Sequence, residues 1–317
     1  IIKNSQTSTA NILVPCTLDM TKIDLAKSDI IKSDDESRLN FIQRIENSLT
    51  KKFQVSCGTD SAGREYDSIT ELWRNEGYFD KNKVPNWYKK SHDYWNNEKN
   101  VPSTIDGMLG GFSVLTERDL DASRKFVDDL LASRPDVKER ICSNGGRASE
   151  CGAGIGRLTK GLLLPLGFKS IDVVETSARL LNSAPGYIGH DDATKCNFIC
   201  KGLQDFDPDA DTYDLIWVQW VVGYLNDWDL CNFFNRLGKS LKKGGIVIVK
   251  DNTCNEKAYL ADRDDGDITR SFQYLLAIIK ESGMRVVQLE SGDDMIRWQT
   301  DFPDDIWPVP MIALCYD

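Results

Sequence analysis

The sequence lacks several features that would assign it to a large class of proteins. It contains no run of about eighteen apolar residues, so no segment is predicted to span a membrane. It contains no internal repeat and no low-complexity tract, which excludes solenoids and compositionally biased chains. Hydrophobic residues make up 41% of the 317 residues, an ordinary fraction that allows a buried core.

Basic residues are outnumbered by acidic ones. The chain has 39 Lys and Arg against 49 Asp and Glu, which gives a formal net charge of −10. An acidic surface repels phosphate backbones, so we expect no nucleic-acid partner and favour a basic peptide.

Histidine is rare, and the cysteines do not form metal-binding patterns. The nine cysteines include no Cys-x-x-Cys pair, which predicts reduced, mostly buried thiols in a cytoplasmic or nuclear protein. Both histidines, His92 and His190, stand in polar stretches and are predicted to lie on the surface. No His/Cys/Asp spacing indicates a metal site, so no metal is predicted.

The chain is predicted to have two parts. Residues 1–83 form an N-terminal extension of unknown role, packed on the main domain of residues 84–317. Within the extension, residues 33–36 (Ser-Asp-Asp-Glu) resemble a capping box, and apolar residues follow at helical spacing up to Phe53, which predicts one amphipathic helix. Residues 56–70 are predicted to be a loop.

The main domain alternates short apolar runs with helical patterns. A helix is predicted to end near Arg134-Pro135. The strands are predicted at 171–176, 197–200, 213–219, 245–251, 285–289 and 310–315, and the further helices at 156–164, 177–184, 227–242 and 268–282. Runs such as Ile-Val-Ile-Val (246–249) are typical of parallel strands buried on both faces. The pattern predicts an α/β, doubly wound, Rossmann-like sheet with helices on both faces.

A glycine loop falls where such a fold binds a nucleotide. The loop runs Glu150-x-Gly152-x-Gly154-x-Gly156. The dinucleotide fingerprint fails because Arg157 occupies its sixth position, and the P-loop fails because no G-K-[ST] follows. An acid followed by glycines two apart is typical of S-adenosylmethionine-dependent methyltransferases: bare backbone permits close approach, and Glu150 would face a cationic amine.

Two further features support this interpretation over a purely structural turn. Glu175 ends the second strand, where a carboxylate can accept both ribose hydroxyls. Residues 202–206 (Gly-Leu-Gln-Asp-Phe) follow the third strand, where an adenine contact belongs. The polar segment 144–149 disagrees, so the first strand is expected to be short or irregular.

Longer motifs resemble one enzyme family. They are Tyr94-Trp95, VPSTIDGMLGGF (101–112), CGAGIGRLTKGLLLPL (151–166), GLQDF (202–206), YDLIWVQWVVGYL (213–225) and IVIVKDN (246–252). The chain from about Trp87 to Pro310 resembles the alpha-N-terminal protein methyltransferases, which methylate the exposed α-amine of Xaa-Pro-Lys/Arg proteins. The resemblance implies a seven-stranded methyltransferase sheet, S-adenosylmethionine as methyl donor and S-adenosylhomocysteine as product.

The resemblance also implies site residues. Cofactor contacts would come from Gly152, Gly154, Arg157, Glu175, Thr176, Leu203, Gln204 and Gln219. Glu175 stands where the family often has Asp. The substrate contacts would come from Tyr94, Trp95, Leu109, Gly110, Trp220, Asn252, Asp262, Ile306 and Trp307. Aligning residues 260–270 requires one inserted residue, so Asp262 and Asp265 can exchange roles with Asp264 or Asp267.

The chemistry assigns a task to several of these residues. A protein α-amine has a pKa near 7.7–8.0, so the enzyme must remove a proton and aim the lone pair. We expect Asp265 to take that proton and the Asn252 side-chain carbonyl to hold the amine. Trp220 would pack the substrate proline ring, and Asp262 would pair with the following Lys or Arg. Without the family, Trp220 would serve equally well as core, and the acids as a solvated turn.

Tyr224 marks a departure from the family. Better-known members carry a histidine at this position, offered as a second proton acceptor. Tyrosine, with a pKa near 10, is a poor base at neutral pH. Either Asp265 works alone, or Tyr224 orders a water. The alternatives to a protein N-terminal methyltransferase are a methyltransferase for a small molecule or RNA, and a non-enzymatic binding protein.

Overall fold

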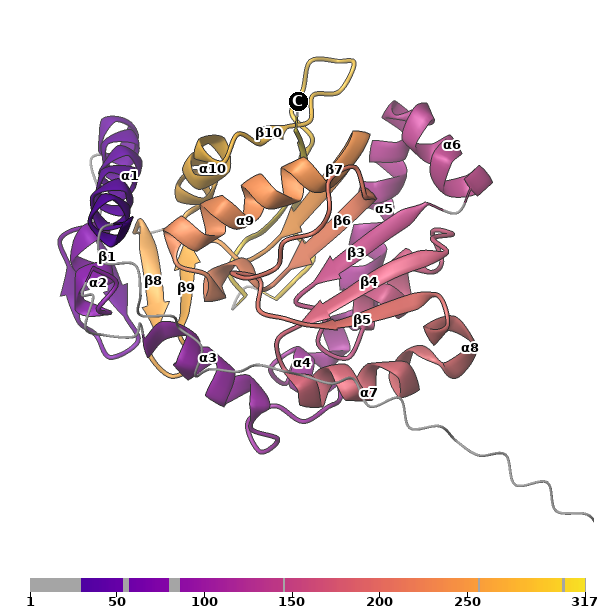
Figure 1. Ribbon diagram of the computed structural model, residues 1–317, viewed down its shortest axis with the longest axis horizontal. Coiled ribbons are helices and arrows are strands. Elements are labelled where there is room, and N and C mark those ends of the chain that lie inside the picture. Colours follow the sequence, from indigo (N-terminus) through magenta and orange to yellow (C-terminus); the bar gives the residue numbers. More distant parts are fainter. Residues whose placement is uncertain are drawn as a thin grey trace, which may run out of the picture.

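A mostly parallel sheet forms the centre of the main domain (Figure 1). The computed structural model describes residues 30–53, 57–79, 86–144, 146–255, 257–303 and 306–316. The strand order of the sheet is β10-β12-β7-β6-β3-β4-β5, and β11 pairs with β12. The five strands from β7 to β5 are parallel, whereas β10, β11 and β7 are antiparallel to β12. The strands are β3 (Arg147–Cys151), β4 (Ser170–Glu175), β5 (Cys196–Cys200), β6 (Tyr213–Gln219), β7 (Leu241–Lys250), β10 (Arg285–Val286), β11 (Ile296–Gln299) and β12 (Val309–Cys315).

Helices cover both faces of this sheet. Successive side chains along a strand point to opposite faces, so strands that are apolar throughout need a covering layer on each side. Ile216 and Val218 of β6 pack with one hydrophobic cluster, whereas Leu215 and Trp217 pack with the other. The first cluster takes in α9 (Asp227–Ser240) and α10 (Phe272–Glu281), and the second takes in α5 (Thr116–Ser133), α6 (Pro135–Asn144) and part of α7 (Ala178–Ile188). The predicted doubly wound α/β fold is therefore confirmed.

The described N-terminal segments pack against one side of this domain (Figure 1). Apolar residues of α1 (Ile30–Phe53) join the cluster that contains α9 and α10. A second, four-stranded sheet has the order β2-β1-β8-β9. Its strands are β1 (Gly58–Asp60), β2 (Glu65–Tyr66), β8 (Tyr259–Asp262) and β9 (Asp267–Arg270). The remaining helices are α2 (Ile69–Asn75), α3 (Asn86–Asn96), α4 (Ile105–Met108) and α8 (His190–Ala193), and the short 3-10 or π turns are η1 (Ser113–Leu115), η2 (Thr159–Leu163) and η3 (Val222–Tyr224).

Three local predictions are wrong. Helix α1 begins at Ile30, so the residues from Ser33 lie inside it and do not cap it. Residues 56–70 contain β1, β2 and the start of α2 rather than only a loop. The helix predicted at 268–282 begins at Phe272, because Ile268 belongs to β9 and Ser271 caps the helix by accepting the Tyr274 N–H. The loop prediction failed because β1 pairs with β8, about 200 residues away, and local patterns cannot register such pairing.

Other predictions hold at this level. The first strand, β3, exists and is short, with five residues. Both histidines are exposed, as predicted. Among the described residues, six cysteines are free thiols, of which Cys151 and Cys254 are buried and the others half-buried, so "mostly buried" is wrong for this set. Cys200 is disulfide-bonded, which corrects the expectation of reduced thiols at that position. Among the described helices, none combines the length and the apolar character needed to cross a bilayer.

Candidate active site

A cavity of about 170 Å³ lies beyond the carboxyl ends of β3, β4 and β6. In a doubly wound sheet this is the switch point, where β3 is followed by strands on opposite sides and ligands bind. All eight residues predicted to contact the cofactor line it: Gly152, Gly154, Arg157, Glu175, Thr176, Leu203, Gln204 and Gln219. The glycine loop and three strand ends thus converge on one cavity.

The conformation of the glycine loop requires residues without side chains. Gly152, Gly154 and Gly156 have φ of +74°, +56° and +81°, a region that disfavours residues with a Cβ. A Cβ on Gly152 would stand 2.6 Å from a Val221 methyl, and one on Gly154 would stand 2.5 Å from Met108 Sδ. Val221 and Met108 also line the cavity, so the loop is shaped for close approach of a ligand to its backbone.

Glu175 ends β4 at the rim of this cavity. One of its oxygens accepts the Gly154 N–H at 2.9 Å, and the other accepts the Ser177 N–H at 2.8 Å. Burial raises the pKa of Glu175, and these backbone hydrogen bonds oppose the rise. Each carboxylate oxygen can accept one further hydrogen bond, which fits the two hydroxyls of a ribose.

Glu150 makes hydrogen bonds within the loop that the sequence did not predict. It is buried, and its carboxylate accepts hydrogen bonds from the backbone N–H of Leu158 at 3.3 Å and of Thr159 at 2.6 Å. The Thr159 hydroxyl donates a third bond at 2.5 Å. These bonds cap the turn that follows the glycine loop, and burial nevertheless raises the pKa of Glu150 to about 7. Glu150 still lines the cavity, but it supports the loop.

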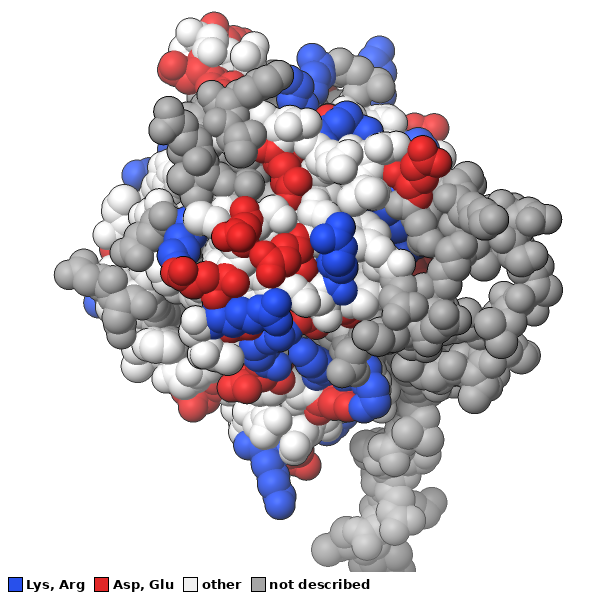
Figure 2. Space-filling model, turned by 90° about the vertical axis from the view of Figure 1, so that its left-hand side faces the viewer, with Lys and Arg blue, Asp and Glu red and all other residues white. Residues whose placement is uncertain are grey.

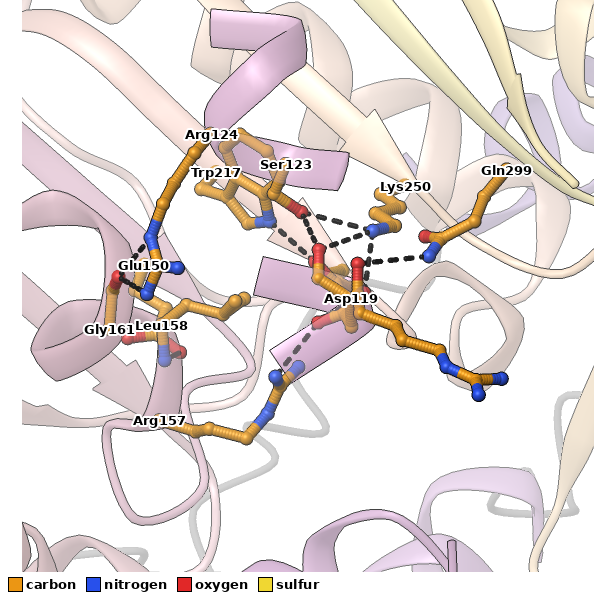
Figure 3. Close-up of polar contacts among 12 residues, drawn as sticks. Asp119, Ser123, Arg124, Glu150, Arg157, Leu158, Gly161, Trp217, Lys250 and Gln299 are labelled. Carbon is orange, nitrogen blue, oxygen red and sulfur yellow. Dashed lines mark hydrogen bonds and ion pairs between the residues drawn. The ribbon is translucent and has the colours of Figure 1, made fainter. Parts of the chain in front are cut away.

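Asp119, which sequence reasoning missed, contacts the cavity-lining Arg157 and the buried Lys250 (Figure 3). It is fully buried in the first turn of α5 and pairs with Lys250 Nζ at 2.5 Å and with an Arg157 Nη at 2.8 Å. Gln219 Nε2 donates to both of its oxygens, at 2.9 and 3.0 Å. Burial opposes ionisation of Asp119, yet the two cations lower its pKa below the usual value. One carboxylate therefore fixes two cavity-lining side chains, Arg157 and Gln219.

Trp220 connects this cavity to a second one. Its φ of +52° is rare for a large side chain and marks a backbone held in place by its surroundings. The following N–H groups, of Val221 and Val222, donate to Asp251 Oδ2 at 2.9 and 3.0 Å. The Trp220 ring lies 5.5 Å from the Arg157 guanidinium, and its Nε1 donates to Asn252 Oδ1 at 3.0 Å.

The second cavity, of about 540 Å³, adjoins the first, since Trp95, Trp220 and Tyr224 line both. Ten of the residues predicted to act on the substrate line it: Tyr94, Trp95, Leu109, Gly110, Trp220, Tyr224, Asn252, Asp265, Ile306 and Trp307. Asp262 does not line it; its Oδ1 accepts the Asp264 N–H at 2.8 Å. Asp267 and Asp251 do line it, and Asp267 is one of the positions to which the inserted residue could shift the alignment.

Burial raises the pKa values of the acids Asp251, Asp265 and Asp267 in this cavity. Tyr224 donates its hydroxyl to Asp265 Oδ2 at 3.0 Å, and Asp265 Oδ1 is buried with no hydrogen-bond partner among the described residues. Burial and the charge of Asp262 raise the pKa of Asp265 to about 6. Burial and the charges of Asp267 and Asp265 raise the pKa of Tyr224 well above 10, so the phenol is no base at neutral pH. Asp265 can accept a proton, and Tyr224 orients it.

The first cavity is bordered by a glycine loop at the switch point of a doubly wound sheet, and it opens into a second cavity that holds a proton acceptor. This arrangement is that of an S-adenosylmethionine-dependent methyltransferase. The chain belongs to the family described as AdoMet-dependent proline di-methyltransferases, which matches residues 83–315.

Individual relatives agree with this assignment. Alpha N-terminal protein methyltransferase 1 of Dictyostelium discoideum is 37% identical over 264 residues, covering 82% of this chain and 91% of the relative. N-terminal Xaa-Pro-Lys N-methyltransferase 1 of Homo sapiens is 39% identical over 228 residues, covering 72% and 95%. A solved S-adenosylmethionine-dependent methyltransferase from Leishmania major superposes with a TM-score of 0.68 at 30% identity, covering 82% of this chain and 96% of that one.

Proposed function

We propose that this protein transfers methyl groups from S-adenosylmethionine to the free α-amine of proteins that begin Xaa-Pro-Lys or Xaa-Pro-Arg. The observation that carries the proposal is the junction of the two cavities at Trp220 and Tyr224, with Asp265 on the substrate side. The names of the relatives, which specify N-terminal Xaa-Pro-Lys substrates, support it.

The first cavity fits the methyl donor in its chemistry. Glycines open its backbone, Glu175 offers acceptors for ribose hydroxyls, and apolar side chains such as Leu203 and Val174 suit an adenine ring. Bound there, S-adenosylmethionine would supply an electrophilic methyl group. We assign its contacts to Gly152, Gly154, Arg157, Glu175, Thr176, Leu203, Gln204 and Gln219.

The residues of the second cavity would prepare the nucleophile. Asp265, with a pKa near 6, is ionised at neutral pH and can take the proton of a bound ammonium. Asn252 Oδ1 already accepts one bond from Trp220 and has capacity for a second, from the amine. The Trp220 ring offers a flat face for the substrate proline. Asp267 adds a carboxyl group whose pKa is raised by burial and would be lowered by the cation that follows the proline.

The direct test is mass spectrometry of an Ala-Pro-Lys peptide after incubation with the protein and S-adenosylmethionine. We expect the peptide to gain one or more methyl groups at its α-amine, and the same peptide with an acetylated N-terminus to gain none. Methyl transfer to total RNA or to small molecules in place of the peptide would overturn the proposal. Calorimetry that shows no heat with S-adenosylhomocysteine would argue against enzymatic function altogether.

A further inference from the structure

The N-terminal segment forms one sheet with the hairpin of β8 and β9, whose acidic turn (residues 262–267) lies at the second cavity. β1 pairs in parallel with β8, from Gly58 opposite Tyr259 to Asp60 opposite Ala261. The Ser61 N–H donates to the Ala261 carbonyl at 2.8 Å and extends this pairing. A two-stranded hairpin alone has marginal stability, so β1 and β2 add the strands that hold β8 and β9 in place.

The turn of this hairpin carries one base among four acids. Arg263 follows Asp262 and precedes Asp264, Asp265 and Asp267. A guanidinium this close in sequence can pair with a turn carboxylate and neutralise it. The second cavity needs those charges if it is to hold a cationic peptide, so the position of Arg263 decides how acidic the cavity is.

Arg263 is bound by the N-terminal segment instead. Its Nε lies 3.0 Å from Asp60 Oδ2, and its Nη1 forms an ion pair with Glu76. Its backbone N–H donates to Ser61 Oγ at 3.0 Å. Glu76 caps the end of α2, and its other oxygen lies 3.6 Å from Lys90 Nζ on α3. Arg263 of the hairpin thus contacts both the β1 segment and the end of α2, about 190–200 residues earlier in the chain.

Asp60 is a preformed acceptor for this guanidinium. Its Oδ1 accepts the backbone N–H groups of Ala62 and Arg64 at 3.1 and 2.9 Å, and its Oδ2 accepts the Tyr66 hydroxyl at 2.8 Å. Burial opposes ionisation, but these bonds and the Arg263 charge lower the pKa of Asp60. The side chains of Asp60 and Glu76 are 1% and 5% exposed, so both carboxylates are fixed in place.

Figure 2 faces this side of the molecule and shows basic and acidic side chains next to one another. An ion pair on the N-terminal segment is an example, since Arg64 Nη2 lies 3.5 Å from Glu71 Oε1. Basic side chains here have acids of their own to pair with. In contrast, Asp265 Oδ1 on the cavity side of the hairpin has no partner among the described residues.

We infer that Asp60 and Glu76 withdraw Arg263 from the acidic turn, so that Arg263 does not pair with Asp265 and this carboxylate is left for a cationic peptide. The inference rests on the proposed function and assigns the N-terminal segment a part in it. Asp60, Glu76 and Arg263 are positioning residues, because they act through the carboxylates of the turn. The second cavity is consequently set up by a segment that lies upstream of the family match, residues 83–315.

The test is a charge-rescue experiment on the full chain. Glu76→Gln releases one side of Arg263, and we expect KM for an Ala-Pro-Lys peptide to rise about tenfold, with kcat and the Kd for S-adenosylhomocysteine within about twofold of the parent. Adding Arg263→Gln removes the released cation and should restore KM to within about twofold. If Glu76→Gln folds poorly, Asp60→Asn replaces it as the variant that releases Arg263. We expect the same rise in KM, and the same recovery of KM when Arg263→Gln is added.

Arg44→Gln is the matched control, because Arg44 joins α1 to Glu281 of α10 at 3.0 Å and lies away from the hairpin. It should leave KM unchanged. If the double variant binds the peptide as poorly as Glu76→Gln, or worse, the segment is only a structural brace and the inference is overturned.

A second readout does not depend on the substrate. Carboxyl ¹³C NMR follows the titration of Asp265, which faces Asp262, Asp267, Tyr224 and Tyr94. We expect Glu76→Gln to lower this titration midpoint, because the released guanidinium favours the ionised form, and the double variant to return it. A parent enzyme that does not methylate the peptide would reject the proposed function, whereas an unchanged midpoint in Glu76→Gln would reject this inference.

Discussion

At the residue scale, the Asp119 carboxylate contacts three side chains beside the first cavity, those of Arg157, Gln219 and Lys250. Asp119→Asn would leave the buried Lys250 ammonium and Arg157 without a counter-charge, so we expect a loss of about 3–5 kcal/mol in the free energy of unfolding. The Kd for S-adenosylhomocysteine should also rise, because Arg157 and Gln219 line that cavity. Thermal unfolding and calorimetry measure the two effects.

Asp121→Asn is the matched control for this prediction. Asp121 lies on the same helix, but it is exposed and pairs only at the surface with Arg124, at 2.7 Å. Its substitution should change stability by no more than about 0.5 kcal/mol. Equal effects of the two substitutions would contradict the role given to Asp119.

Asp265 should carry the pH dependence of the reaction. Because it accepts a proton only when ionised, kcat/KM for an Ala-Pro-Lys peptide should fall as the pH drops through about 6, its raised pKa. Asp265→Asn should lower kcat about 10²–10⁴-fold and remove that limb of the pH profile, while the Kd for S-adenosylhomocysteine stays within about twofold. A variant that retains full turnover would exclude Asp265 as the proton acceptor.

The same substitution should increase stability. The pKa of Asp265 is higher in the folded protein than its ordinary value of 3.8, so the folded state loses stability as the pH rises from about 4 to 6. At pH 7.5 the neutral Asn side chain removes that cost. We expect Tm to rise by about 1–2 °C, the shift that roughly 1 kcal/mol gives in a chain of 317 residues with an unfolding entropy of about 2.1 cal/mol/K per residue. Scanning calorimetry at pH 4 should show a much smaller difference.

Several site residues could be predicted one by one, and Asp119 could not. The predicted cofactor residues line one cavity. They could be identified because they lie in or near long sequence motifs around Gly152, Glu175 and Gln219. Asp119 lies outside any chemical motif. Its signal was its place on the apolar stripe of a helix, in register with Ser123, Phe126 and Leu130, where an acid must be paired when buried.

At the scale of elements, the sequence predicted the helices and strands that are long enough to show a hydrophobic pattern within their own residues. β4 and β6 lie within one residue of their predicted spans, because fully apolar runs bounded by turns identify buried parallel strands. The short strands β1, β2 and β9 have two to four residues, too few for a period to register. β1 also depends on pairing with β8, about 200 residues away along the chain, which no local pattern encodes.

The glycine loop allows a prediction at this scale. Gly154→Ala places a methyl group against Met108 Sδ and forces a residue with a Cβ to adopt φ of +56°. We expect the Kd for S-adenosylhomocysteine to rise about tenfold or more, measured by calorimetry. Gly186→Ala in α7 is the control, since nothing lies within 4 Å of its added methyl and helices favour Ala. An unchanged Kd in Gly154→Ala would mean that the loop does not approach the ligand.

At the scale of the whole molecule, the net charge of −10 bears on how a substrate arrives. A basic N-terminus would be attracted by the overall field, and the second cavity adds Asp251, Asp265 and Asp267 at the end of the path. Salt screens such attraction, with a Debye length of about 10 Å at 0.1 M and about 3 Å at 1 M. We therefore expect KM for an Ala-Pro-Lys peptide to rise severalfold between about 0.05 and 0.5 M NaCl, with little change in kcat.

The neutral peptide Ala-Pro-Gln separates this long-range attraction from a general effect of salt on the enzyme. Its KM should be higher at low salt and nearly insensitive to added NaCl, because its third side chain carries no charge for the acids to attract. The two KM values should converge as the salt concentration rises and the acids are screened. If both peptides respond alike, the excess of acidic residues serves solubility alone, and recognition of the third residue depends on shape.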